Sequence, residues 1–250
     1  MKKIVSLAII LILTVSCMFP DAVAEEKKIS VVTTIFPIYD WTREVIGSND
    51  HVQLTLLLDS GVDLHSYQPT AADIMKIATC DVFIYVGGES DEWVEDALHE
   101  AVNQNMTVIN LVNAMGGDIK VEEIVEGMEH EHDEHDDREN EHEHEDEADE
   151  HVWLSLRNAQ KLVNAIAAAF GDADPAHAES YRTNAAAYND KLAVMDHEFS
   201  QSVSGAAFRT VLFGDRFPFR YLVDDYDLNY YAAFSGCSAE TEAKIGRAHV

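Results

Sequence analysis

The sequence predicts an α/β fold of two doubly wound α/β lobes joined by one long helix, with the second lobe incomplete. Two observations predict this fold. Short β-branched or aliphatic runs alternate with segments of helical periodicity over residues 29–115, which is typical of parallel βαβ units. The same alternation restarts after residues 176–204, a stretch without Gly or Pro that would form a helix roughly 44 Å long.

The first lobe is placed at residues 25–121, and its elements follow from apolar runs and their boundaries. Strands are expected where β-branched or aliphatic residues cluster, over 29–35, 52–58, 81–86 and 107–111. Helices are expected between them, over 39–46, 70–78 and 92–102, with Gly47 ending the first and Pro69 opening the second.

Residues 122–150 interrupt this pattern. They hold 17 Asp and Glu against one Arg, together with five of the twelve histidines. A segment with so little apolar content cannot bury enough surface to offset its ordering entropy, so a disordered loop is predicted.

Two helices and a second lobe follow the acidic loop. Ser155 is a good N-cap for a helix that completes the first lobe within residues 151–173 and ends at Gly171. Asp174, as cap, and Pro175 open the connecting helix of residues 174–204. Residues 205–244 begin the second lobe, with a strand over 210–213, a helix over 217–225 and a strand over 228–231.

The amino-terminal end carries a targeting signal. Lys2 and Lys3 precede the apolar run of residues 4–15, and a small-x-small cleavage site follows at residues 22–24, so residues 1–24 are predicted to be a signal peptide. Residues 14–17 partly resemble a bacterial lipobox, which makes lipid attachment at Cys17 the alternative. Both interpretations place the mature protein outside the cytoplasmic membrane, in the periplasm or on the outer face of that membrane.

The carboxyl-terminal end is unusual. Residues 245–250 read like a translated sequencing adapter that interrupts a helical stretch, so we expect the natural protein to be longer. Source codons that do not encode the adapter would contradict this expectation. Cys237 could then find a disulfide partner in the further sequence, because an extracytoplasmic compartment permits disulfides.

Composition excludes several classes of protein. With 17 Lys and Arg against 46 Asp and Glu, the net charge of −29 argues against binding to nucleic acid or to anionic lipid. Three cysteines are too few for a disulfide scaffold. The signatures H-E-x-x-H, G-x-S-x-G, the phosphate-binding Gly-Lys-Ser/Thr loop and G-x-G-x-x-G are all missing, so we do not expect an enzyme.

Histidines are the residues best suited to chemistry in this chain. His65 follows the second predicted strand, where open α/β sheets place ligands, and His151 precedes a predicted helix. Neutral imidazole binds zinc well, although a single loop histidine is usually structural or merely exposed. The acidic loop adds a cluster suited to weak, multi-site metal capture, the alternative being a solvated linker; its members are His130, His132, His135, His142 and His144.

These features together resemble one family, the zinc- and manganese-binding solute-binding proteins of bacterial ABC importers. Residues 61–73 resemble its G-V-D-x-H-x-Y-x-P-x-x-x-D motif, residues 88–98 resemble the segment after its third strand, and a His-rich loop precedes H-V-W-L-S at residues 151–155. The resemblance implies two α/β lobes joined by a long helix, with His65 and His151 as the first two metal ligands.

The chain departs from the family at the third ligand. The resemblance places a histidine of the second lobe at Arg216, whose guanidinium cannot ligate a metal at neutral pH. Asp215 is the nearest donor and the candidate replacement; the alternatives are an N-cap or an ion-pair partner of a neighbouring arginine. The fourth ligand would fall beyond Val250.

The resulting hypothesis is capture of a divalent metal ion by a monomer, which delivers it to the membrane permease of an ABC importer. Zn²⁺ is favoured because two imidazoles and a carboxylate suit it, and Mn²⁺ is the alternative. Three rival functions stay open at this point: an adhesin-like protein of the same fold, a zinc hydrolase, and a metal buffer that acts through the His-rich loop.

Overall fold

The computed structural model describes residues 28–59, 61–123, 125, 128, 148–234 and 236. The predicted signal peptide with Cys17, the five loop histidines, Cys237 and the adapter-like tail lie outside the described residues. In the part of the chain that is described, no helix is both long and apolar enough to cross a membrane.

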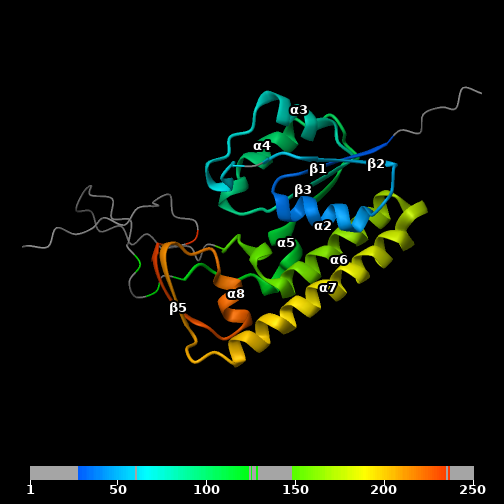
Figure 1. Ribbon diagram of the computed structural model, residues 1–250. Coiled ribbons are helices and arrows are strands. Elements are labelled where there is room, and N and C mark those ends of the chain that lie inside the picture. The colour runs from blue at the N-terminus through cyan, green and yellow to red at the C-terminus, as the bar shows by residue number, and fades with distance from the viewer. Residues whose placement is uncertain are drawn as a thin grey trace, which may run out of the picture.

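The first lobe is built on a four-stranded parallel sheet in the order β2-β1-β3-β4. Helices cover both faces of this sheet, with α3 and α4 on one side and α2, α6 and α7 on the other (Figure 1). The elements of this lobe before the acidic loop are β1 (Ile29–Thr33), α2 (Phe36–Ile46), β2 (Val52–Leu56), α3 (Ala71–Thr79), β3 (Val82–Tyr85), α4 (Trp93–His99), β4 (Thr107–Asn110) and α5 (Leu111–Met115).

Burial explains why the strands were visible in the sequence. Strand β3 is flanked by β1 and β4 and covered by helices, so Val82, Phe83 and Ile84 are fully buried and read as a continuous apolar run. The chain passes from β1 to β2 on one side and then returns to β3 on the other side of β1. The carboxyl ends of β1 and β3 therefore form a topological switch point, where open α/β sheets bind ligands.

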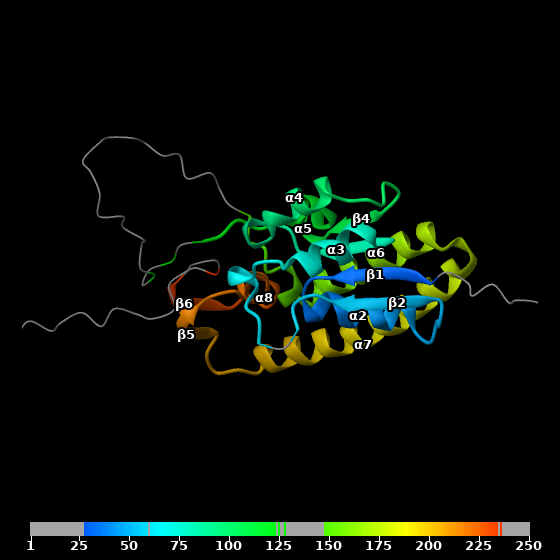
Figure 2. The same ribbon diagram turned by 90° about the horizontal axis from the view of Figure 1, so that it is seen from above.

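Helices α6 (Leu156–Ala173) and α7 (Ala178–Ser204) form a hairpin that packs against α2 and contributes to the core of the first lobe. The prediction that α6 ends at Gly171 was wrong, because the helix continues for two residues past it. Asp174 also does not cap the next helix with its side chain, since its carboxylate binds the side chains of His177 and Tyr181 instead. With 27 residues, α7 is about 40 Å long and runs from the first lobe to the second (Figure 2).

The second lobe, as far as it is described, has two parallel strands and one short helix, namely β5 (Thr210–Arg216), α8 (Arg220–Asp225) and β6 (Asn229–Phe234). Its small core is separate from that of the first lobe and contains Met128, Phe217, Val223 and Ala232. The predicted α/β fold class with parallel sheets is thus confirmed. The short helix α5 was not foreseen.

Candidate metal site

His65 is held in a short 3₁₀ turn, Leu64–Ser66, that follows β2. Asp63 caps this turn, because its Oδ1 accepts a hydrogen bond from the backbone N–H of His65 at 3.1 Å. Leu64 is buried against the core and anchors the turn from the other side. The imidazole of His65 is therefore fixed at the carboxyl edge of the sheet, beside the topological switch point.

His151 lies at the start of another 3₁₀ turn, Val152–Leu154, and is 2% exposed. The carboxylate of Asp149 binds this histidine twice. Asp149 Oδ1 accepts the backbone N–H of His151 at 2.8 Å and lies 3.0 Å from its ring Nδ1. Both the position and the ring orientation of His151 are thus set by one carboxylate.

The two imidazoles meet at the edge of the sheet. Their Nε2 atoms are 3.4 Å apart, although the residues are separated by 86 positions in the chain. Two nitrogen ligands of a tetrahedral Zn²⁺, each about 2.1 Å from the ion, would lie about 3.4 Å from each other. The observed separation is therefore the one that a shared zinc ion requires.

Hydrogen bonds on the far side of each ring determine which nitrogen faces this gap. Ser90 Oγ donates to Glu150 Oε1, so it accepts from the Nδ1–H of His65, which lies 2.8 Å away. His151 in turn donates its Nδ1–H to Asp149. Both Nε2 atoms then present lone pairs to each other, an arrangement that a cation between them would stabilise.

Glu150 is a second carboxylate beside this pair, after Asp149, and is fully buried. Its oxygens accept hydrogen bonds from the backbone and side chain of Ser90, and Oε1 lies 3.4 Å from Nδ1 of His65. Gly88 makes room for it, since a Cβ there, at φ 88°, would lie 2.7 Å from Glu150 Oε2. Within the described residues, Glu150 and the two histidines form the group of three donors that could hold a metal ion.

Electrostatics favour the neutral, metal-binding form of His65. Burial lowers the pKa of this imidazole, and the neighbouring His151 and Arg216 lower it further, while Glu150 opposes the shift. A neutral ring keeps its Nε2 lone pair available for a metal. The nearby buried carboxylates supply the negative charge that a bound cation would need.

Asp215 does not join the two histidines, contrary to the expectation from the sequence. Side chains alternate along a strand, and Arg216 points to the first lobe, where its guanidinium pairs with Asp63 at 2.9 Å. Asp215 is exposed, and its Oδ1 accepts the backbone N–H of Arg216. In the described part of the chain, its carboxylate belongs to no group of three metal donors.

The base of the acidic loop is ordered, which the sequence did not predict. Asp149 and Glu150 were assigned to a disordered segment, yet they are 2% and 0% exposed. Val121 and Ala148 form an antiparallel bridge. Tyr221 of α8 connects the two segments of this bridge. Its hydroxyl donates to the carbonyl of Asp149 at 2.7 Å and accepts from the backbone N–H of Lys120 at 3.2 Å.

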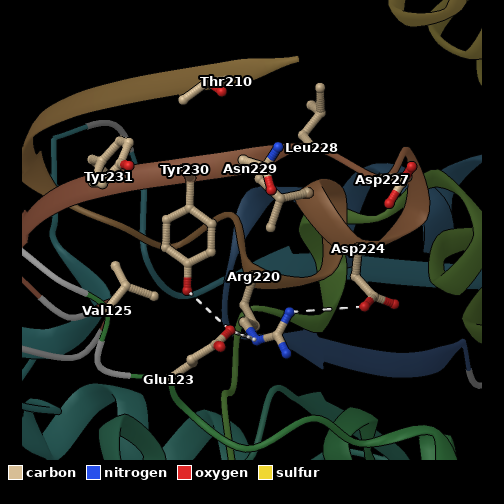
Figure 3. Close-up of a pocket in the computed structure, with 11 residues that line it drawn as sticks. Glu123, Val125, Thr210, Arg220, Asp224, Asp227, Leu228, Asn229, Tyr230 and Tyr231 are labelled. Atoms are coloured by element: carbon tan, nitrogen blue, oxygen red, sulfur yellow. Dashed lines mark hydrogen bonds and ion pairs between the residues drawn. The ribbon is translucent and has the colours of Figure 1, made fainter.

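A hollow of about 630 Å³ lies beside β5, α8 and β6, and neither His65 nor His151 lines it (Figure 3). Arg220 forms ion pairs with two of the carboxylates that line it. Arg220 lies 3.3 Å from Glu123 and 3.9 Å from Asp224, and Tyr230 donates to Glu123. The central charges of this hollow are thus engaged in ion pairs with one another instead of converging on a common point.

Comparison with known proteins identifies the family. The profile of the family described as "Zinc-uptake complex component A periplasmic" (ZnuA) matches residues 31–249. The chain therefore belongs to this family, which confirms the resemblance seen in the motifs.

The individual relatives reported below are named as zinc-binding or zinc-uptake proteins. The chain is 34% identical over 222 residues to the high-affinity zinc uptake system protein ZnuA of Bacillus subtilis, covering 89% of this chain and 66% of that protein. It is 32% identical to the zinc-binding lipoprotein AdcA of Streptococcus pneumoniae serotype 4, covering 99% of this chain and 47% of that one. The crystal structure of Zn(II)-bound AdcA from Streptococcus pneumoniae superposes with a TM-score of 0.66 at 30% identity, covering 86% of this chain and 41% of that chain. The chain thus spans less than two thirds of these relatives' own lengths.

Proposed function

We propose that this protein captures Zn²⁺ outside the cytoplasmic membrane and delivers it to the membrane permease of an ABC importer. The observation that carries the proposal is the 3.4 Å separation of the two Nε2 atoms of His65 and His151. Each ring is held from behind by a carboxylate or a hydroxyl, which is the usual support of metal-ligating histidines. Membership of the zinc-uptake family supports this choice of cargo and of partner.

Zn²⁺ is preferred to Mn²⁺ on the chemistry of these donors. Imidazole nitrogens suit zinc, whereas manganese prefers sites made mainly of oxygen ligands. Glu150 is the third donor of the group, and its oxygens are shared with Ser90. We infer that Glu150 mainly orients His65 and balances the charge of the cation, and that water or further donors complete the coordination.

The direct test is a competitive zinc titration against a chelator of known affinity. The double variant His65→Ala, His151→Ala should lose tight binding, at least a hundredfold, while His99→Ala, which removes an exposed histidine on α4, should bind like the unchanged protein. Tight binding that survives in the double variant would contradict the proposal and favour a buffer that acts through the acidic loop.

The acidic loop has a separate role in this proposal, as a collector of low affinity. Deletion of residues 129–147 leaves the bridge at Val121 and Ala148 and the hydrogen bond of Tyr221 in place. Tight binding of one zinc ion should therefore persist in the deletion variant, and only the weak additional binding should disappear. Loss of the tight site on deletion would refute this division of labour.

Transport itself needs a cellular test. Deletion of the gene should reduce zinc uptake by cells grown with limiting zinc, and a copy carrying the His65→Ala, His151→Ala substitutions should not restore it. Normal uptake in the deletion strain would favour the adhesin-like alternative. The predicted export to the periplasm or to the outer face of the cytoplasmic membrane is part of the same proposal.

A further inference from the structure

A second pair of histidines lies at the other end of the first lobe. His51 directly precedes β2, whereas His65 follows the carboxyl end of the same strand. His177 directly precedes α7, at the corner of the α6–α7 hairpin. This corner lies beside the start of β2 in both ribbon views (Figures 1 and 2). The rings of His51 and His177 have their centroids 5.5 Å apart.

The centroid separation of this pair is close to that of the proposed zinc site. The centroids of His65 and His151 are 5.3 Å apart, and the angle between the ring planes is 51°, against 36° in the second pair. An ion bound through Nε2 lies about 3.2 Å from the centroid of an imidazole, so two rings that share one ion have centroids at most about 6.4 Å apart. The separation in the second pair therefore allows a shared ion.

A chain of hydrogen bonds connects the backbone of His51 to the ring of His177. Asn49 accepts the backbone N–H of His51 at 2.9 Å and donates to the hydroxyl of Tyr181 at 3.0 Å. Tyr181 is fully buried and donates to Asp174 Oδ2 at 2.6 Å, and the same oxygen lies 2.7 Å from Nδ1 of His177. The backbone of one histidine is thus connected to the ring of the other through buried or half-buried groups.

Asp174 has the role toward His177 that Asp149 has toward His151. Its side chain is only 12% exposed. Burial raises the pKa of Asp174, but the hydrogen bonds from Tyr181 and His177 more than offset this, so its pKa is lowered and the group is a carboxylate at neutral pH. A carboxylate on Nδ1 fixes the tautomer in which Nε2 carries the lone pair, as in metal-ligating histidines.

From this arrangement we propose that His51 and His177 form a second binding site for a divalent transition metal such as Zn²⁺, with Asp174 as the supporting carboxylate. The two imidazoles would be the protein ligands and water would fill the remaining coordination positions. We therefore expect this site to bind zinc more weakly than the site of His65 and His151. Imidazole ligands select zinc, copper or nickel over magnesium and calcium. This inference does not depend on the function proposed for His65 and His151.

The test is a Zn²⁺ titration of the full chain at pH 7.5, followed by NMR of the histidine imidazoles, because only a residue-resolved readout separates this site from the other histidines. The resonances of His51 and His177 should shift together with one midpoint. His51→Gln should abolish the response of His177, and His177→Gln should abolish that of His51. The control His99→Gln should leave both responses unchanged.

Asp174→Asn keeps the size of the side chain and removes its charge, and should raise the zinc midpoint of both resonances by 10- to 100-fold. This variant and the wild-type co-titration keep the test decisive even if a histidine variant folds poorly. Separate midpoints for the two rings, a response of one ring that survives loss of the other, or no response at millimolar zinc would each overturn the proposal.

Discussion

The carboxylate of Asp149 offers the sharpest test of the proposed zinc site, through the substitution Asp149→Asn. The side chain is 3% exposed, and its Oδ1 binds both the backbone and Nδ1 of His151. Asparagine keeps an acceptor oxygen of the same size, so the ring orientation of His151 should survive. What is lost is one negative charge behind the ligand.

The size of the effect follows from the geometry. An ion on Nε2 of His151 would lie about 7 Å from Asp149 Oδ1, across the imidazole. At an effective dielectric constant of about 20, the attraction between a unit negative charge and a divalent cation at this distance is about 5 kcal/mol, which is an upper bound. The retained hydrogen bond and the neighbouring charge of Glu150 reduce the loss, so we expect zinc affinity to fall 10- to 100-fold, or about 1.4 to 2.7 kcal/mol.

The assay is a chelator-competition titration at fixed pH and salt, with thermal unfolding of the metal-free protein as a check on folding. Asp118→Asn is the matched control, because it removes the same charge from an exposed aspartate that pairs with Lys161 on the surface. Asp149→Ala removes the acceptor as well and should weaken binding further. Equal zinc affinities for Asp149→Asn and Asp118→Asn, with both proteins folded, would refute the reasoning.

Two further predictions concern Arg216 and Asp91. Arg216→His should raise zinc affinity at least tenfold in the same titration, because it replaces a cation near His65 by an imidazole. Arg216→Gln removes only the charge and so separates the loss of the cation from the gain of a ligand. Unchanged affinity in the histidine variant would contradict the inference that residue 216 lies close enough to the site to affect the metal. Burial raises the pKa of Asp91 to about 6, so between pH 4 and pH 6 the folded protein binds more protons than the unfolded chain. The free energy of unfolding should therefore fall by roughly 3 kcal/mol as pH rises through this window, and Asp91→Asn should flatten the profile measured by urea denaturation; an unaltered profile would show that Asp91 titrates normally.

Local sequence patterns were sufficient to predict most of the first lobe. Its four strands are short and buried, so each is a compact apolar run with clear boundaries. Ser155 caps α6 as expected, because its Oγ accepts the backbone N–H of Asn158. The prediction that Asp174 caps the next helix failed because its carboxylate binds other side chains instead of the free backbone N–H groups. One of them is Tyr181, seven residues further on, whose hydroxyl donates to Asp174.

The two histidines were predicted from motif spacing, but their supporting carboxylates were not. Asp149 and Glu150 belong by composition to a run of acidic residues, and no local pattern distinguishes these two from their neighbours. Glu150 is buried because of contacts with Ser90, 60 residues earlier, and because Gly88 leaves space for it. Such long-range partners become visible only when the chain is folded.

The support of the site also links the two lobes. Asp63 caps the turn that carries the first histidine, and its other oxygen pairs with Arg216 of β5. Asp149 holds the second histidine with its side chain, and its carbonyl accepts a hydrogen bond from Tyr221 of α8. Each imidazole is therefore positioned by a first-lobe aspartate that a second-lobe residue also contacts. If these contacts hold the rings at the separation that a cation needs, binding of the cation and contact between the lobes favour each other by linkage.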